Sequence, residues 1–145
     1  MKILIINGPN MNMLGIREPE IYGHTTYADL LQMIRDAKGD KHELSFVQSN
    51  HEGDLVDAIQ QAYFQKVDGI VMNPAAYTHT SVALADAIKA VGIPTIEVHV
   101  SDPDSRDDFR KVSYVRSVAA GLVKGKGLQG YIEAIDLLEE LAAAK

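Results

Sequence analysis

The sequence contains no cysteine among its 145 residues. Disulfides, thiolate nucleophiles, zinc fingers and iron–sulfur clusters are therefore excluded. Basic residues are also in the minority, with 14 Lys and Arg against 20 Asp and Glu and a formal net charge of −6. No segment forms a basic stripe, so we expect neither nucleic acid nor an anionic membrane as a partner.

Long hydrophobic runs are also missing from the first part of the chain. Residues 3–6 are apolar, but the polar sequence Asn7-Gly8 follows at once. This run is too short for a signal-peptide core or a membrane span, so we expect a soluble, cytoplasmic protein. The content of 46% hydrophobic and 23% charged residues is ordinary for a globular protein, and the length fits one domain over residues 1–145.

Short apolar runs alternate with segments of helical periodicity along the whole chain. The pattern predicts strands at 3–6, 44–47, 69–72, 94–98 and 119–123. It predicts helices from a Thr25/Thr26 cap to Gly39, over 52–66, from a Thr80/Ser81 cap to 91, and over 128–144. Such alternation is typical of βαβ units. We therefore expect a flavodoxin-like α/β fold, with a five-stranded parallel sheet in the order 2-1-3-4-5 and helices on both faces.

In a sheet of this kind, ligands bind beyond the carboxyl ends of the strands. Polar residues follow three of the predicted strands, at 7–10, 73–81 and 99–101. A 17-residue segment, 8–24, also separates the first strand from its helix, which is long for such a connection. Its length and composition favour an active-site lid over a purely structural loop.

Several ligands common on this fold lack their sequence signals here. No G-x-G-x-x-G or G-K-[ST] motif is present, and no Ser/Thr-rich turn follows the first strand to hold a flavin phosphate. Asn7 and Asn73 stand where a receiver domain would carry carboxylates for magnesium. The acidic run 102–108 lacks the Gly and Glu of a calcium loop. We expect no metal site.

Two of the five histidines, His79 and His99, follow predicted strands and are candidates for acid–base chemistry. Glu97 lies two residues before His99, so both side chains share one face of a strand, where Glu97 either orients His99 or pairs with another neighbour. Arg106 and Arg110 are four residues apart and would share a helical face, as a substrate clamp or as a surface ion-pair cluster. The other histidines include His42 and His51, which we expect at the surface, and His24, which is ambiguous.

Four blocks of the sequence resemble one enzyme family. They are IINGPNMNMLGIREPEIYG at 5–23, NPAAYTHTSVALAD at 73–86, EVHVS with RDDFR at 97–101 and 106–110, and GKGLQGY at 125–131. Together they closely resemble the signatures of the type II 3-dehydroquinate dehydratases, nearly end to end. The resemblance implies a flavodoxin-like lyase that dehydrates 3-dehydroquinate to 3-dehydroshikimate without a cofactor, by anti elimination through an enolate.

The resemblance also implies roles for individual residues. Tyr22 would be the base, Arg17 its activator, His99 the acid and Glu97 the residue that orients the acid, while Asn10 would position a water. The substrate would be bound by a further set of residues: Asn73, His79, Asp86, Val100, Ser101, Arg106 and Arg110. The family's assembly, a homododecamer built as a tetramer of trimers, is expected here too.

Two positions depart from the family pattern. Asp102 stands where the family usually has Asn, and we expect its carboxylate to point outward or to cap the next segment. Asp107 replaces a usual Glu and is one methylene shorter. A non-enzymatic ligand-binding or response module on the same fold, and a lyase of another hydroxylated cyclic acid, remain as alternatives. The sequence also leaves open whether the pathway is aromatic amino acid biosynthesis (shikimate) or quinate breakdown.

Overall fold

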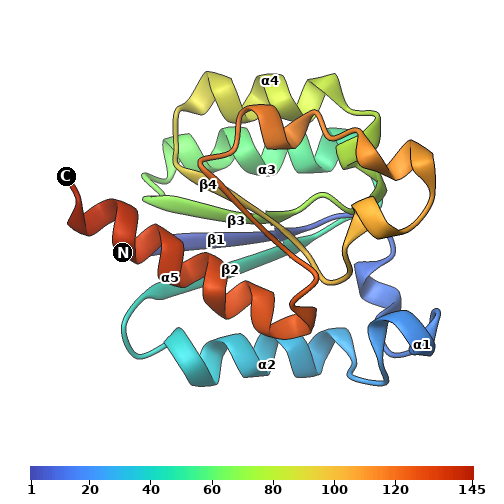
Figure 1. Ribbon diagram of the computed structural model, residues 1–145. Helices are drawn as coiled ribbons and strands as arrows, with labels where there is room; N and C mark the ends of the chain where they lie inside the picture. The colour runs from blue at the N-terminus through green and yellow to red at the C-terminus, as the bar shows by residue number, and fades with distance from the viewer.

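The computed structural model describes the backbone of residues 1–145 and the side chains of residues 1–20 and 23–145. Five parallel strands form one sheet in the order β2-β1-β3-β4-β5 (Figure 1). The strands are β1 (Lys2–Asn7), β2 (Glu43–Gln48), β3 (Gly69–Asn73), β4 (Thr95–His99) and β5 (Gly121–Lys124). The predicted flavodoxin-like topology is confirmed.

Helices cover both faces of the sheet (Figure 1). On one face lie α2 (Tyr27–Lys38) and α5 (Gly130–Ala143), and on the other lie α3 (Glu52–Phe64) and α4 (Val82–Val91). Each face has its own core because successive side chains of a strand point to opposite sides. In β1, for example, Ile3 and Ile5 pack in one core, whereas Leu4 and Ile6 pack in the other.

The ends of the helices follow local sequence signals. Thr26 and Asp29 form a reciprocal capping box at the start of α2, and Ser81 caps α4, as the sequence predicts. Gly92 ends α4 in the left-handed conformation with φ of 68°. Helix α3 ends two residues earlier than predicted, because Lys66 has a positive φ of 58° that no α-helix accommodates.

The segment 8–24 is more structured than a simple loop. It contains a 3-10 turn, Met11–Met13, and the short helix α1 (Pro19–Tyr22). Met11 and Leu14 are buried in the core next to α2, whereas Ile16 is 69% exposed. The first half of this segment is therefore anchored by apolar packing.

A polar network joins α2 to α5 near the amino ends of the strands. Lys38 is buried, and its Nζ lies 2.6 Å from Asp136 Oδ1 and 2.5 Å from Glu139 Oε1. His42 Nε2 lies 3.2 Å from the other oxygen of Glu139, and the His42 side chain is only 9% exposed. The prediction that His42 is a surface residue is therefore wrong: it fills the gap between the end of α2 and α5.

The charges of this network shift one another's protonation. Burial alone would lower the pKa of Lys38, but the bonds from Asp136 and Glu139 outweigh it and raise the pKa. The bond from Lys38, aided by His42, lowers the pKa of Glu139 to about 2 despite partial burial. Each charged form thus stabilises the other.

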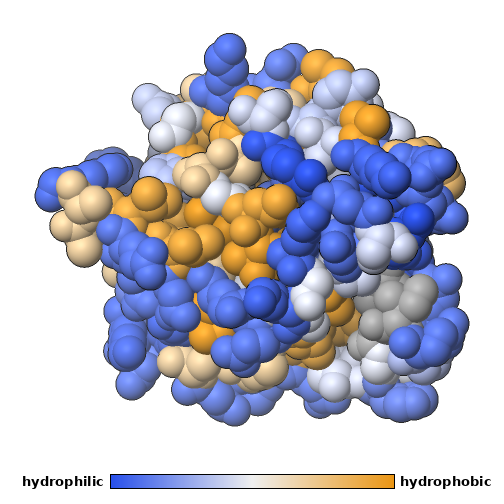
Figure 2. Space-filling model, in the orientation of Figure 1, coloured by the Kyte–Doolittle hydropathy of each residue, from blue (hydrophilic) through white to orange (hydrophobic). Residues whose placement is uncertain are grey.

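The surface carries an apolar area above α5 in the view of Figure 2. A groove in this region is lined by Ile88, Ile93, Val118, Ala120 and Leu141, from α4, the two segments that lead into β4 and β5, and α5. Among the helices that the structure describes, none is both long and apolar enough to cross a lipid bilayer.

Candidate active site

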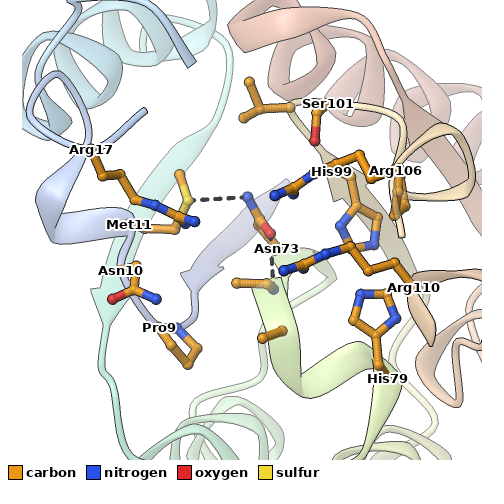
Figure 3. Close-up of a pocket in the computed structure, with 14 residues that line it drawn as sticks. Pro9, Asn10, Met11, Arg17, Asn73, His79, His99, Ser101, Arg106 and Arg110 are labelled. Atoms are coloured by element: carbon orange, nitrogen blue, oxygen red, sulfur yellow. Dashed lines mark hydrogen bonds between the residues drawn. The ribbon is translucent and has the colours of Figure 1, made fainter. Parts of the chain in front are cut away.

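A cavity of about 110 Å³ opens at the carboxyl ends of β1, β3 and β4 (Figure 3). Its lining comprises Pro9, Asn10, Met11, Arg17, Asn73, Ala75, Ala76, His79, His99, Val100, Ser101, Pro103, Arg106 and Arg110. Arg17 and Asn10 lie on one side, His79, His99, Arg106 and Arg110 lie on the other, and Asn73 lies between them. This is the edge of the sheet that the sequence pattern indicates.

Asn73, which lines the cavity, belongs to a hydrogen-bonded set of three buried polar side chains. Tyr131 donates from its hydroxyl to Asn7 Oδ1 at 2.5 Å and accepts from Asn73 Nδ2 at 2.9 Å. Asn73 Oδ1 accepts from the Ala75 amide at 3.0 Å. Burial raises the pKa of Tyr131, so its phenol stays protonated as a donor. The orientation of Asn73 is therefore fixed before any ligand binds.

Two backbone segments meet closely at the same edge. The Gly8 amide donates to Asn73 O at 2.8 Å, and a Cβ at Gly8 would lie 2.5 Å from the Pro74 carbonyl oxygen. Only glycine permits this approach. It brings the segment after β1 against the segment after β3, and so brings Asn10 into the cavity wall. Asn10 itself has a φ of 70°, and its amide donates to Asn50 Oδ1 at 3.0 Å.

Glu97 and His99 form a buried pair on β4. They are two residues apart and on one face, as predicted, and His99 Nε2 bonds Glu97 Oε2. The same oxygen accepts from Thr78 Oγ1 at 2.9 Å and lies 3.1 Å from Ser113 Oγ. Burial alone would raise the pKa of Glu97, but the bonds from His99, Thr78 and Ser113 outweigh it and lower the pKa. An ionised Glu97 accepts the Nε2 proton of His99, and Nδ1 is then the nitrogen available to a ligand.

His79 is held in a different way. Its Nδ1 lies 2.6 Å from the carbonyl oxygen of Val112. A carbonyl only accepts, so Nδ1 carries a proton and Nε2 is left for the cavity. The two histidines at the predicted strand ends therefore present opposite ring nitrogens. Only His99 has a carboxylate partner among the hydrogen bonds of these two rings in the described part of the chain.

The guanidinium groups of Arg17, Arg106 and Arg110 all border the cavity. Glu18 Oε2 lies 2.9 Å from Arg17 and 3.8 Å from Arg106, and Asp107 pairs with Arg110 at 3.1 Å. The spacing suggested that Arg106 and Arg110 share a helical face, but the structure has no single helix that carries both. Two separate 3-10 turns, Pro103–Ser105 and Asp108–Lys111, bring them to the same cavity. The site thus gathers positive charge.

The segment after β4 supplies Val100 and Ser101 to the cavity wall. Asp102, which departs from the family pattern, accepts from the Asp104 amide at 3.0 Å and lies 3.3 Å from Lys124 Nζ. Its carboxylate caps the 3-10 turn that follows. The expectation that Asp102 acts as a cap is confirmed, and its charge is paired away from Ser101.

Of the predicted site residues with described side chains, Asp86 and Glu97 do not line this cavity, and Glu97 acts on it only through its bond to His99. Asp86 is exposed on α4 and does not line the cavity. Tyr22 ends helix α1, and its side chain lies outside the described residues. No group of three metal-binding side chains occurs within the described residues.

Sequence reasoning missed Thr78, Ser113 and Tyr131, which hold the lining residues without bordering the cavity themselves. Thr78 directly precedes His79, and Tyr131 ends the segment 125–131 that resembles the family, so both lie next to sequence signals of the site. Nothing local marks Ser113, because its partner Glu97 is 16 residues away.

Comparison with known proteins agrees with this geometry. The family model described as dehydroquinase class II matches residues 1–139. The chain is 53% identical over 143 residues to a 3-dehydroquinate dehydratase of Fusobacterium nucleatum, with 97% of each chain covered. A protein of the same name from Caldicellulosiruptor bescii is 52% identical over 141 residues, again with 97% of each covered.

The fold agrees equally well with a solved structure. The crystal structure of a type II dehydroquinase from Butyrivibrio crossotus superimposes with a TM-score of 0.93 at 52% identity, covering 96% of this chain and 97% of that one. Similarity of this extent spans every segment that builds the cavity, from Pro9 to Arg110. The chain therefore belongs to the class II dehydroquinase family.

Proposed function

We propose that this protein dehydrates 3-dehydroquinate to 3-dehydroshikimate, the reaction named for its relatives. The observation that carries the proposal is the His99–Glu97 pair, which opens into a small cavity bordered by cationic and amide side chains. Elimination of water beside a ketone needs a base for the C2 proton, an acid for the C1 hydroxyl and stabilisation of an enolate oxygen. The cavity contains candidates for the acid and for the stabilising groups.

His99 is the proposed acid. Because its Nε2–H is engaged by the Glu97 carboxylate, only the imidazolium has a proton on Nδ1 to give. Glu97 stabilises that imidazolium and fixes the direction of the ring. Transfer of the Nδ1 proton to the departing hydroxyl releases water and leaves a neutral His99.

Tyr22 is the proposed base, with Arg17 as its activator. A free phenol titrates near pH 10, so proton removal by tyrosinate at neutral pH needs a nearby cation. Arg17 borders the cavity on the same segment as Tyr22 and supports this assignment. The enolate left at the ketone would be held through a water positioned by Asn10, which lies in the same wall.

The remaining polar residues are proposed to bind the substrate. Asn73, His79 and Arg110 would bind ring hydroxyls, and their preset orientations support this role. The Val100 and Ser101 amides, with the Ser101 hydroxyl and Arg106, would bind the substrate carboxylate, since they line one side of the cavity. No cofactor takes part in the proposed reaction.

The test is the appearance of the conjugated enone absorbance when 3-dehydroquinate is added. Wild type is expected to turn over, and Tyr22→Phe, which removes only the phenol oxygen, is expected to fold and to lose proton abstraction. Activity should survive borohydride, because an elimination through an enolate forms no lysine Schiff base. Binding without absorbance change would favour a non-enzymatic module, and a folded, active Tyr22→Phe would place the base elsewhere.

We further propose a cytoplasmic homododecamer, built as a tetramer of trimers, that serves the shikimate or the quinate pathway. The apolar groove between α4 and α5 supports burial against another copy. Asp86, exposed on α4, would then have to reach the cavity of a neighbouring copy to bind substrate. Sedimentation should give an assembly about twelve times the 15.9 kDa chain, and a monomer would contradict the proposal.

A further inference from the structure

Residues 112–114, which we call the strap, run between the turn that carries Arg110 and the inner end of the active site. The strap joins the turn Ala75–His79 by three hydrogen bonds. His79 Nδ1 bonds Val112 O at 2.6 Å, the Tyr114 amide donates to Thr78 O at 2.8 Å, and the hydroxyls of Thr78 and Ser113 lie 2.6 Å apart. The strap is thus fixed to Thr78, which contacts Glu97, and to His79, which lines the cavity.

Ser113 also reaches the pair directly. Its Oγ lies 3.1 Å from Glu97 Oε2, the oxygen that already bonds His99 and Thr78. The other oxygen, Oε1, is buried and has no hydrogen-bond partner in the described part of the chain. All the hydrogen bonding that keeps this fully buried carboxylate charged is therefore concentrated on Oε2. Because all of these bonds are made to one oxygen, loss of any one donor should raise the free energy of the charged form of Glu97.

The chemistry of the donors suits this position. Thr78 and Ser113 offer two hydroxyl protons, and the Arg116 amide donates to Ser113 Oγ at 3.1 Å, which directs the Ser113 proton toward Glu97 or Thr78. Neutral donors stabilise the carboxylate without cancelling its charge, so the charge remains for His99. A cation in their place would compete with the imidazolium.

Apart from His99, no described ionisable side chain bonds the Glu97 carboxylate. Glu97 lies on the face of β4 opposite to Ile96 and Val98, which pack toward α5. The ionisable residues on α4 and on the turns and strap near the Glu97 face are Tyr77, His79, Asp86, Lys89, Asp108, Arg110, Lys111, Tyr114 and Arg116. None of these has a hydrogen bond or ion pair to Glu97 among the described contacts, which join Glu97 only to Thr78, His99 and Ser113.

We propose that Ser113, with Thr78, is a positioning residue that keeps Glu97 ionised and aimed at His99, and that the strap thereby links the Arg110 turn to the acid. The role in turnover rests on the proposed function. The effect on the ionisation of Glu97 does not, because it is a property of the free protein. An experiment on the free protein therefore tests the positioning role separately from the proposed function.

The test compares Ser113→Ala with Ser113→Thr, which keeps the hydroxyl. Ser117→Ala is the matched control, because the Ser117 hydroxyl donates only to the Tyr114 carbonyl at 2.7 Å. Ser113→Ala is expected to lower kcat about tenfold with little change in KM, since it removes a bond to a charged group but no ligand contact. The acid limb of the pH–rate profile should move to higher pH, because losing a donor raises the pKa of Glu97. Ser113→Thr and Ser117→Ala should resemble wild type.

A double-mutant cycle shows whether Ser113 acts through Glu97. In a Glu97→Gln background, Ser113→Ala should cause little further loss, because there is no charge left to hold. An equal loss in both backgrounds, or an unmoved acid limb, would overturn the proposal. If Ser113→Ala does not fold, Ser113→Cys, which keeps the volume but donates weakly, gives the same comparison.

A carbon-13 NMR titration of the Glu97 carboxyl tests the positioning role without measuring activity. Ser113→Ala should raise the titration midpoint of this carbon, and Ser117→Ala should leave it unchanged. If wild type fails to dehydrate 3-dehydroquinate but the Glu97 midpoint rises in Ser113→Ala, the proposed function fails and the positioning role stands. An unchanged midpoint rejects the positioning role whatever the activity.

Discussion

Glu97 and Lys38 are both buried charged side chains, but the protein stabilises them by different means. The ammonium group of Lys38 is paired with two carboxylates of α5, Asp136 and Glu139, which neutralise its charge. Glu97 is surrounded by hydroxyls and one histidine at the inner end of the cavity. The first arrangement neutralises the charge of Lys38 and joins two helices, whereas the second keeps the negative charge of Glu97 available to His99.

The difference predicts that the two networks can be damaged separately. Removing the acid with His99→Ala should lower turnover by about 10²- to 10⁴-fold, the usual contribution of one acid–base group, while the protein stays folded. His79→Ala is the natural comparison and should mainly raise KM. Steady-state kinetics with circular dichroism measures both. If His79→Ala lost turnover and His99→Ala only raised KM, the two roles would be exchanged.

The Lys38 network should show the opposite behaviour. Lys38→Met keeps the apolar stem but leaves Asp136 and Glu139 without their cation, and should lower the free energy of unfolding by about 2 kcal/mol. Turnover of the folded enzyme should stay normal, because the network lies near the amino ends of the strands, whereas the cavity lies at their carboxyl ends. Urea unfolding at a fixed protein concentration measures the loss, with the exposed Lys41→Met as control. Loss of kcat in folded Lys38→Met would show that the networks are coupled.

Acid should weaken the Lys38 network in a defined window. The pKa of Glu139 is about 2 in the folded protein against an ordinary value of 4.5. Its contribution to stability is therefore complete above about pH 4.5 and is lost as the pH falls toward 2. Glu139→Gln should unfold with a weaker pH dependence across this window than wild type. The exposed neighbour Glu140 offers the control: Glu140→Gln should keep the wild-type slope.

The parts of the molecule that the sequence predicts well are those set by local or periodic signals. The alternation of apolar runs predicts the strand order, and Thr26, Ser81 and Gly92 act at helix ends as expected. The spacing of Glu97 and His99 predicts that they share a face, because a strand has a period of two.

Contacts between distant segments were beyond the reach of such signals. Ser113 meets Glu97, and Tyr131 meets Asn7 from 124 residues away, only because the sheet brings their segments together. The burial of His42 against α5 has the same origin. The cap made by Asp102 was expected from the sequence, but the break between the two 3-10 turns that separates Arg106 from Arg110 was not.

The gathering of Arg17, Arg106 and Arg110 around one opening also affects how a ligand arrives. The chain as a whole carries a net charge of −6, whereas three guanidinium groups border the opening against the two carboxylates of Glu18 and Asp107, so we expect small anions to be attracted there. Such a field shortens the diffusional search and raises the encounter rate of a negatively charged molecule. Because ions screen charges beyond about 8 Å at physiological ionic strength, the encounter rate should fall as salt is added, and a neutral analogue of the same shape should not feel the difference.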